Sequence, residues 1–491
     1  MPILILLTLL SLGDAAKILG VFNHPAKSHT FLGTVLFEEL ASRGHEVTFV
    51  NAYPTRNTQS NYKNIVIEGI AQDLINREMI YFNHKSDQIR IILESLEMSL
   101  VHMAATFENP QLKEIISSNH TFDLVICDYF YNDANLILGH VFKAPVILLS
   151  SFGNTLATSH FTGNDLPFSY VPGCSLQLDD NMDFWERLRM TISGSTLLWI
   201  LRDSRRRHTE LMEKYFDDVP SMEDLYNNVA VVLANSHYSF ETVRPSTPNI
   251  IPIGGFHLKS PKPLEKELRQ LMETSENCVI YFSLGSQIKT SNMGNKTIKA
   301  FLDVFTKSGC QVLWKFEKRH EGNAHPKTKV FITHGGTLSM IEALNYGVPM
   351  IAIPFNGDQH MNAKFIETRK LGKLLNLEDV AEETFGEVLS SIIGDPIFQK
   401  NARQYSSLLR NQPIKPLDNA IFWIEHVIAH KGSPHLKPAS IKLSWIQYHL
   451  IDVYAVILGT IFLILSSVLI LIYVVLSKLG YFSTMKKLKI S

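Results

Sequence analysis

Cysteine is scarce in this chain, which has 491 residues and only four cysteines. Their spacing matches neither a zinc site nor the dense framework of a small disulfide-rich protein. Cys127 and Cys278 lie in apolar, strand-like runs, so we predict buried thiols at both positions. Stability must therefore come from hydrophobic cores, and a chain of this length is expected to form two domains.

An excess of charge of one sign is also missing, because 46 Lys and Arg residues face 47 Asp and Glu residues. A net charge of −1 leaves no basic footprint for nucleic acid, so we expect no nucleic-acid partner. The local basic cluster from Arg205 to His208 favours a solvated helix face. The preceding stretch "RMTISGSTLLWILRDS" is amphipathic. It favours a helix packed on the core, with contact to a membrane surface as the alternative.

Both ends of the chain are apolar. The start, "MPILILLTLLSLGDAA", has the short apolar core and small residues of a secretory signal, although it lacks the usual positive charge. We predict a signal peptide over residues 1–16, with cleavage near Ala16. A buried N-terminal strand is the weaker alternative, because the better strand "KILGVFN" follows directly.

Charge is absent again from residues 453–477, about 25 residues that are long enough to span a bilayer. Lysines follow this stretch, and positive charge marks the cytosolic side. We therefore predict a single-pass type I protein with a lumenal body. The tail ends in "KLKIS", which resembles a dilysine signal for retrieval to the endoplasmic reticulum, although plain topology charges remain an alternative. Asn119 and Asn295 begin glycosylation sequons.

Two series of short apolar runs predict two parallel sheets. The first series includes "KILGVFN", "HEVTFVNA", "FDLVICD" and "APVILLSS", and the second includes "CVIYFSLG", "QVLWKFE", "KVFITHGG" and "VPMIAIP". Such runs, separated by helix-like segments, are typical of sheets buried on both faces. The fold class is thus α/β, with two Rossmann-like, doubly wound domains facing a cleft and a C-terminal transmembrane helix. The two Rossmann-like domains are predicted at residues 17–250 and 251–435. A juxtamembrane segment at 436–452, the membrane span at 453–477 and a cytosolic tail at 478–491 follow them.

The turn in "FITHGGTLSMIEAL" joins a strand to a helix. Gly335 and Gly336 let a backbone come close to a ligand, and the helix N-terminus favours a phosphate. His334 can donate to a phosphate oxygen, and Glu342, two turns along the helix, can reach a ribose hydroxyl. Alone, a His-Gly-Gly turn is more often structural than functional.

Two further turns follow strands of the same predicted sheet. "VPMIAIPFNGDQ" ends in Asp358 and Gln359, whose carboxylate and amide suit the paired hydroxyls of a sugar. "YFSLGS" places Gly285 and Ser286 at its tip. Because ligands bind beyond the carboxyl ends of parallel strands, we expect these three turns to form one binding site.

With these motifs the chain resembles the membrane-bound UDP-glycosyltransferase family. The string "FITHGGTLSMIEALNYGVPMIAIPFNGDQHMNA" is similar to the second half of its signature, and "RGHEVTFV", "IGGFHLKSPKPL", "IYFSLGS" and "LSWIQYHLIDVYAVI" resemble other family segments. "HPAKSH" is most similar to invertebrate members. The resemblance implies a GT-B fold and transfer of a hexose from UDP-glucose or UDP-glucuronate to a hydroxyl of a small lipophilic acceptor.

The resemblance also implies a catalytic pair, His29 as base and Asp128 behind it. A hydroxyl must lose its proton as it attacks, and a His can take that proton at neutral pH. The carboxylate fixes the tautomer and stabilises the imidazolium. Attack opposite UDP would invert the anomeric carbon. We expect His334, the helix start and Ser286 to hold the diphosphate, with no metal and no further cofactor.

Helix-forming residues are missing where the family has them, between "QVLWKFE" and "KVFITHGG". The connection "EKRHEGNAHPKT" cannot form a helix with an apolar face. If the two strands are neighbours, a crossover layer is absent. Family members carry another strand and a Trp-x-Pro-Gln turn here, and we expect the loss of a central strand. Loss of base stacking, worth roughly 1–3 kcal/mol, would weaken UDP binding by about tenfold to more than a hundredfold.

The chain departs from the family pattern at two further positions, and three hypotheses about its function stay open. Leu338 and Ser339 stand where many members have a small polar residue and Gly, and we keep Ser339 with the donor-binding residues. Histidines without a comparable case are expected on loops or helix surfaces; they are His24, His325 and His360. The chain is an active enzyme, a catalytically impaired partner of active relatives, or a spliced form that does not accumulate. Homo- or hetero-oligomers are both compatible with these hypotheses.

Overall fold

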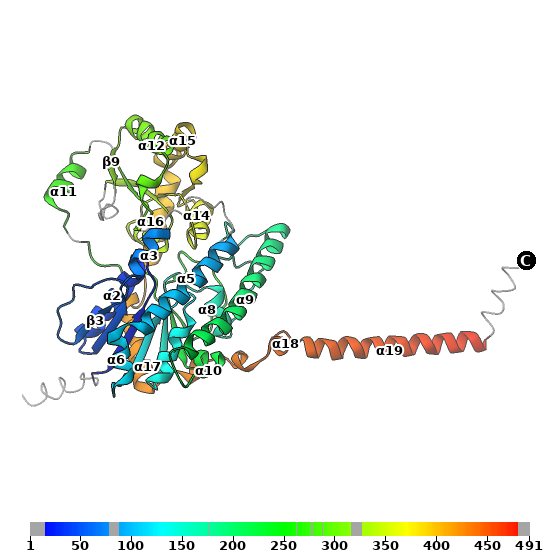
Figure 1. Cartoon of the computed structure of the whole chain (residues 1–491). Helices are drawn as coiled ribbons and strands as arrows, with labels where there is room; N and C mark the ends of the chain where they lie inside the picture. The colour runs from blue at the N-terminus through cyan, green and yellow to red at the C-terminus, as the bar shows by residue number, and fades with distance from the viewer. Residues whose placement is uncertain are drawn as a thin grey trace, which may run out of the picture. The chain divides into compact units, whose positions relative to one another are not determined.

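The computed structural model describes residues 15–77, 88–174, 176–261, 263–275, 278–286, 288–315 and 327–479 (Figure 1). Its contacts divide the chain into two units, one ending at Lys437 and one starting at Pro438. The first unit carries two parallel sheets, and the second carries the long apolar helix. The predicted signal peptide falls almost wholly outside the described residues, as does most of the predicted cytosolic tail.

The first sheet has seven parallel strands in the order β3-β2-β1-β4-β5-β6-β7. Its strands are β1 Lys17–Phe22, β2 Glu46–Asn51, β3 Tyr62–Val66, β4 Leu124–Asp128, β5 Val146–Ser150, β6 Val229–Ala234 and β7 Ile250–Pro252. Both faces are covered, so β4, β5 and β6 are buried at every position, as their continuous apolar runs predict. The strand order reverses between β1 and β4, and a doubly wound sheet binds its ligand at such a switch point.

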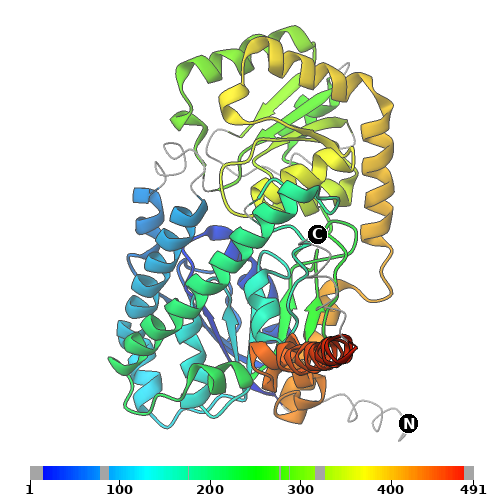
Figure 2. The ribbon, with the colours of Figure 1, turned by 90° about the vertical axis from the view of Figure 1, so that its right-hand side faces the viewer.

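Helices flank this sheet on both faces (Figures 1 and 2). They are α2 Lys27–Ser42, α3 Ile70–Arg77, α5 Gln88–Glu108, α6 Pro110–Ser117, α7 Ile137–Val141, α8 Leu156–Phe161, α9 Phe184–Glu213 and α10 Met222–Asn227. Two buried clusters form the core, one on each side of the strands. Phe22, Phe37 and Phe49 meet edge-on or tilted in one of them, with ring centroids 4.6–5.4 Å apart.

The second sheet has five parallel strands in the order β12-β11-β10-β8-β9. They are β8 Val279–Ser283, β9 Gln311–Trp314, β10 Thr328–Thr333, β11 Met350–Ala352 and β12 Gly372–Leu374. The helices of this lobe are α11 Lys266–Glu273, α12 Asn295–Ser308, α13 Thr337–Tyr346, α14 Gln359–Thr368, α15 Glu382–Gly394 and α16 Pro396–Arg410. Here the order reverses between β8 and β10, so the turns after these two strands share the switch point.

The strand order corrects the expectation that a central strand has been lost. β9 and β10 are not neighbours, because β8 lies between them and pairs with both. Within the described residues β9 is the edge of a continuous sheet, whose order 2-1-3-4-5 is a common doubly wound arrangement. Most of the connection that lacks a helical pattern, with Ala324, His325 and Pro326, falls on residues 316–326 and lies outside the described residues.

A disulfide joins Cys278 to Cys310, with the two Cα atoms 4.8 Å apart. The prediction of a buried thiol at Cys278 is therefore wrong, whereas Cys127 is a buried free cysteine as expected. Each disulfide cysteine directly precedes a strand, β8 or β9, and these strands are neighbours. The bridge fastens the edge strand to the sheet.

The chain crosses between the lobes twice. β7 belongs to the first sheet, so the predicted boundary at 250/251 falls inside a strand of the first lobe. After α16 the chain returns to the first lobe as α17 Pro416–His430 (Figure 2). The buried face of α17 joins the core beside α2. The two lobes are thereby tied together at the start and at the end of the second sheet.

The second unit contains α18 Trp445–Tyr448 and α19 Ile451–Lys478. α19 has 28 residues and a mean hydropathy of 2.9 over its most apolar window, and it is long enough to cross a bilayer. The predicted span 453–477 lies inside this helix. Among the described residues it is the one helix that meets both criteria of length and composition.

Candidate functional site

The first-lobe half of the site lies where β1, β4 and β5 end side by side. Asp128 is the last residue of β4, and His29 lies in the first turn of α2, which follows β1. Nδ1 of His29 is 2.6 Å from Oδ2 of Asp128, and the two side chains are 2% and 0% exposed. Ser151, directly after β5, donates to Oδ1 of Asp128 at 3.1 Å. Three strand ends thus place a histidine, its carboxylate and a hydroxyl in contact.

Three rings enclose His29. The His24 ring stacks on it with centroids 4.0 Å apart, and Phe130 and Phe152 contact it edge-on. Nδ1 of His24 accepts the backbone N–H of Ala26 at 3.1 Å. Burial, and then the neighbouring His29, hold the pKa of His24 well below its ordinary value. His24 is therefore a neutral, buried ring, and it lies on the loop after β1, as expected.

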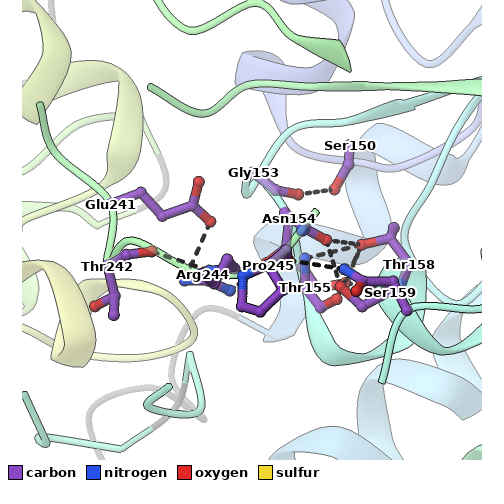
Figure 3. A network of polar contacts seen from close by, with 11 residues as sticks. Ser150, Gly153, Asn154, Thr155, Thr158, Ser159, Glu241, Thr242, Arg244 and Pro245 are labelled. Atoms are coloured by element: carbon purple, nitrogen blue, oxygen red, sulfur yellow. Dashed lines mark hydrogen bonds and ion pairs between the residues drawn. The ribbon is translucent and has the colours of Figure 1, made fainter. Parts of the chain in front are cut away.

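The loop that carries Ser151 and Phe152 is held on both sides (Figure 3). Ser150 donates to the carbonyl of Gly153 at 2.6 Å. Arg244, from the segment between β6 and β7, donates to the carbonyl of Asn154 at 2.8 Å and forms an ion pair with Glu241 at 3.2 Å. These contacts fix the loop, and with it the hydroxyl behind Asp128.

The second-lobe half of the site is the turn between β10 and α13. Gly335 has φ +81° and Gly285, after β8, has φ +79°, values that favour glycine. A Cβ at Gly285 or at Gly336 would lie 2.6 or 2.5 Å from the ring of His334. Both glycines therefore make room for this imidazole at the start of α13.

A lysine that the sequence reasoning missed lies beside this turn. Lys315, just after β9, donates to the carbonyl of Gly285 at 2.7 Å. Burial, and then the charge of Lys315, lower the pKa of His334 to about 4. His334 is therefore neutral at pH 7 and can donate one N–H, while Lys315 carries the positive charge. Ser286 is exposed at the tip of the neighbouring turn.

Asp358 and Gln359 lie in the site, but Oδ2 of Asp358 and the side-chain amide of Gln359 already form hydrogen bonds within the protein. Oδ2 of Asp358 accepts from the backbone N–H and hydroxyl of Thr337, at 3.0 and 2.6 Å, and from Asn362 at 2.9 Å. Burial raises the pKa of Asp358, and these hydrogen bonds oppose the shift. Gln359 accepts from two backbone N–H groups and donates to Asn356. In this arrangement both residues shape the loop and the start of α13.

One cavity of about 480 Å³ joins the two halves. The predicted residues on its wall are His29, Gly285, Ser286, His334, Gly336, Ser339, Glu342, Asp358 and Gln359. Asp128 lies behind His29, and Gly335 is buried within the turn. A second, mainly apolar pocket of about 120 Å³ shares Phe130 and Phe152 with this wall. Among the described residues, no group of three or more His, Cys, Asp or Glu side chains is arranged to hold a metal.

Comparisons with known proteins show the family of this chain. The family model described as UDP-glucoronosyl and UDP-glucosyl transferase matches residues 17–487. UDP-glycosyltransferase UGT5 of Dactylopius coccus is 32% identical over 97% of this chain and 95% of its own length. Human UDP-glucuronosyltransferase 2B15 is 29% identical over 88% of each chain.

Solved structures show the same architecture. The glycotransferase of kitacinnamycin has a TM-score of 0.57 at 17% identity and matches 84% of this chain and 100% of its own. The calicheamicin glycosyltransferase CalG4 has a TM-score of 0.55 at 15% identity, over 85% and 99% of the two chains. At these identities the likeness shows the fold, which is GT-B. The chain thus belongs to the UDP-glucoronosyl and UDP-glucosyl transferase family, as a glycosyltransferase whose donor is a UDP-sugar.

Proposed function

We propose that the protein transfers a hexose from UDP-glucose or UDP-glucuronate to a hydroxyl of a small lipophilic acceptor, with inversion at the anomeric carbon. The observation that carries this proposal is the buried contact of His29 with Asp128, which lies across the cavity from the His334 turn. In this proposal His29 is the base on one wall of the cavity, and the start of α13 binds the anion on the other. An acceptor between them meets the sugar from the side opposite the diphosphate.

His29 acts as the base in this proposal. Its Nδ1–H donates to Asp128, which leaves the lone pair of Nε2 for the acceptor hydroxyl. As the hydroxyl oxygen bonds to the anomeric carbon, its proton passes to Nε2 and the bond to UDP breaks. The imidazolium is then stabilised by Asp128, whose other oxygen accepts from Ser151. Neutral His24, stacked on the ring, adds no competing charge.

The diphosphate is held by protein groups. The first N–H groups of α13 lack helical partners, and the helix dipole favours an anion there. His334 donates an N–H and Lys315 supplies a positive charge. We propose that these groups balance the leaving diphosphate without a metal. Glu342, on the same helix and on the wall of the cavity, would bind the ribose.

The apolar pocket favours a lipophilic acceptor. It lies between the loops after β4 and β5 and helices α5, α8 and α9, and apolar residues form most of its wall. A compact apolar pocket next to one base selects an acceptor with a hydrophobic body and a single reactive hydroxyl. Phe130 and Phe152 line both this pocket and the cavity that holds His29.

We also propose that the body is lumenal in the endoplasmic reticulum, with α19 as its anchor. The disulfide between Cys278 and Cys310 suits an oxidising compartment. Asn119 and Asn295 are exposed and open to a glycosyltransferase of the lumen. Treatment of the expressed protein with a glycosidase should reduce its apparent mass by the mass of two glycans. Asn119→Gln and Asn295→Gln should each remove one of these two glycans. Digestion of the body by protease added outside sealed microsomes would instead place it in the cytosol.

The function is tested with the full chain in nanodiscs. UDP-glucose and UDP-glucuronate are offered with a panel of lipophilic phenols and alcohols, and the anomeric configuration of the product is read by NMR. We expect a β-linked product from the α-linked donor, and loss of turnover in His29→Ala with UDP binding retained. An α-linked product would overturn the mechanism. A folded wild type that binds UDP but never turns over would favour the catalytically impaired partner.

A further inference from the structure

The turn after β4 contains a strained residue. Tyr131 has φ +55°, in the left-handed region that bulky side chains rarely adopt. The other described residues with such a φ, glycines apart, lie at the ends of helices, where this conformation is common; they are Lys143, Lys370, Lys431 and Leu450. Tyr131 instead lies between a strand and a short 3₁₀ helix. Strain of this kind persists only where surrounding contacts impose it, and it is frequent at functional sites.

Two hydrogen bonds hold this turn. The side chain of Asn132 accepts the backbone N–H of Phe130 at 3.0 Å, and Ser99 of α5 donates to the carbonyl of Tyr131 at 2.6 Å. The ring of Phe130 lies edge-on to the ring of His29, with the two centroids 5.9 Å apart. The strained residue therefore lies next to a ring that encloses the proposed base.

A buried amide, Asn23, joins this turn to the loop after β1. Asn23 is 1% exposed and directly follows β1. Its Nδ2 donates to the hydroxyl of Thr106 at 3.0 Å and to Oδ1 of Asn135 at 3.1 Å. Its Oδ1 accepts from Asn132 at 3.0 Å and from Asn135 at 3.1 Å. The side chain thus uses both of its N–H groups and both lone pairs of its oxygen. We call Asn23, Thr106, Asn132 and Asn135 the amide cluster.

Helix α5 supports both loops from behind. Thr106, which accepts from Asn23, and Ser99, which donates to Tyr131, are seven residues apart and therefore lie on one face of the helix. Their side chains are buried, at 0% and 5% exposure. The loop after β1 and the turn after β4 are thereby tied to each other and to the same helix.

The sheet alone does not fix the position of the base. β1 and β4 pair as neighbours, which sets the place of Asp128 at the end of β4. His29, however, lies seven residues beyond the end of β1, so its place depends on the loop that starts at Asn23. The amide cluster contacts this loop at its first residue.

We propose that Asn23 is a positioning residue for the sugar transfer, which holds the loop after β1 and the turn after β4 in the arrangement that the His29–Asp128 contact needs. Asn23 is not one of the described residues that line the cavity, so it acts through its neighbours. These are His24, which stacks on His29, and Phe130. The role in transfer rests on the proposed function of His29 as the base.

The first readout is the proton between His29 and Asp128. The contact is buried, so this proton exchanges slowly with water, and its short hydrogen bond moves the NMR resonance downfield. In the full chain labelled with ¹⁵N-histidine, His29→Ala identifies the resonance. We expect Asn23→Leu, which keeps the size of the side chain and makes none of the four hydrogen bonds, to shift or abolish it. The matched control is Asn61→Leu, before β3, which loses two hydrogen bonds to backbone carbonyls. It should lower the thermal midpoint and leave the resonance unchanged.

The second readout is turnover of UDP-glucose and UDP-glucuronate with lipophilic acceptors. A base displaced by about 1 Å costs up to about 100-fold in rate, so kcat of Asn23→Leu should fall by about 10- to 100-fold. The KM for the donor and the affinity for UDP should stay those of the wild type. Ser99→Ala should also lower kcat, and it should cost less in a Tyr131→Gly background, because glycine adopts the left-handed conformation without strain.

The outcomes separate this proposal from the proposed function. A wild-type resonance and a wild-type kcat in Asn23→Leu would overturn it, as would a loss of kcat that is matched by the loss of UDP affinity. If Asn23→Leu does not fold, Ser99→Ala decides, and an equal loss of kcat with and without Tyr131→Gly would count against the strained turn. A resonance that responds to Asn23→Leu in a chain without turnover would support the positioning role and refute the chemistry.

Discussion

Substitution of the two glycines that pack against the ring of His334, Gly285 and Gly336, tests the proposed donor site. Gly336 has an ordinary φ of −62°, so Gly336→Ala adds no backbone strain, but its Cβ would lie 2.5 Å from Nε2 of His334. Gly285→Ala brings the same ring within 2.6 Å and adds the strain of φ +79°. Gly69→Ala has strain alone, because its φ is +85° and no atom lies within 4 Å of the added Cβ. The three variants separate displacement of the ring from backbone strain.

The expected magnitudes follow from these geometries. A left-handed alanine costs about 1–2 kcal/mol, so Gly69→Ala and Gly285→Ala should both lower the thermal midpoint. Displacing His334 removes one hydrogen bond to a charged phosphate, worth about 1.5–3 kcal/mol. Gly336→Ala and Gly285→Ala should therefore weaken UDP-glucose binding by about 10- to 150-fold, and Gly69→Ala should not.

Calorimetric titration of the full chain with UDP-glucose measures these affinities. His334→Ala should weaken binding as much as Gly336→Ala does, and the double variant should lose little more, because both remove one interaction. If Gly336→Ala binds UDP-glucose like the wild type, His334 is not a phosphate ligand. Additive losses in the double variant would show that the added Cβ obstructs the donor directly.

Three further predictions concern the base, pH and the disulfide. Asp128→Asn keeps the shape of the site but removes the charge behind His29, so kcat should fall by about 10²–10⁴-fold, measured as turnover at saturating donor. The pKa of His334 is about 4 in the free protein and should rise when the diphosphate binds, because the bound anion favours the imidazolium. The affinity for UDP-glucose should therefore increase as pH falls from 7 towards 5, and His334→Gln should abolish this dependence in a series of titrations. Cys278→Ser/Cys310→Ser opens a loop of sequence separation 32 and should cost about 3–4 kcal/mol of stability, seen as a lower thermal midpoint, while Cys174→Ser should leave the midpoint unchanged.

The strands and the residues at their ends were predictable from the sequence. Continuous apolar runs identify buried parallel strands, and parallel strands bring their carboxyl ends to one edge. The turns of Gly285, His334 and Asp358 were therefore expected at one edge of the sheet, and they line one cavity. The bond from Thr337 to Asp358, which caps α13, was not predictable, because it depends on how the loop after β11 folds back.

Contacts between distant segments account for what the sequence did not predict. Ser151 reaches Asp128 only because β4 and β5 are neighbours in the sheet. The disulfide depends in the same way on β8 and β9 lying side by side. His24 and His29 are five residues apart, and their stacking depends on how the loop after β1 folds. A helical pattern likewise cannot show that only one side of α9 finds a core. The Ser151 contact and the disulfide follow from strand order, which one sequence does not specify.

The strand order also shows whether the short connection before β10 is long enough to join β9 to β10. The chain must pass from the end of β9 to the start of β10 across β8, which pairs with both strands. This path covers the length of one strand and two strand spacings, roughly 16–20 Å. Residues 315–327 reach at most about 45 Å, so the connection is long enough without a helix. A longer segment of the family type could add a strand only beside β9, at an edge that the disulfide already fastens.

The missing family segment is therefore expected to weaken nucleotide binding more than it changes the fold. The sheet is continuous from β9 to β12, and His334, Lys315 and the start of α13 line the site that we propose for the diphosphate. What the sequence lacks is the Trp-x-Pro-Gln turn, which in related sequences is expected to hold the uracil. Stacking of this kind is worth roughly 1–3 kcal/mol, so the donor should bind more weakly while the His29–Asp128 pair keeps its geometry. A raised KM for the UDP-sugar with kcat largely retained is the kinetic pattern that this arrangement implies.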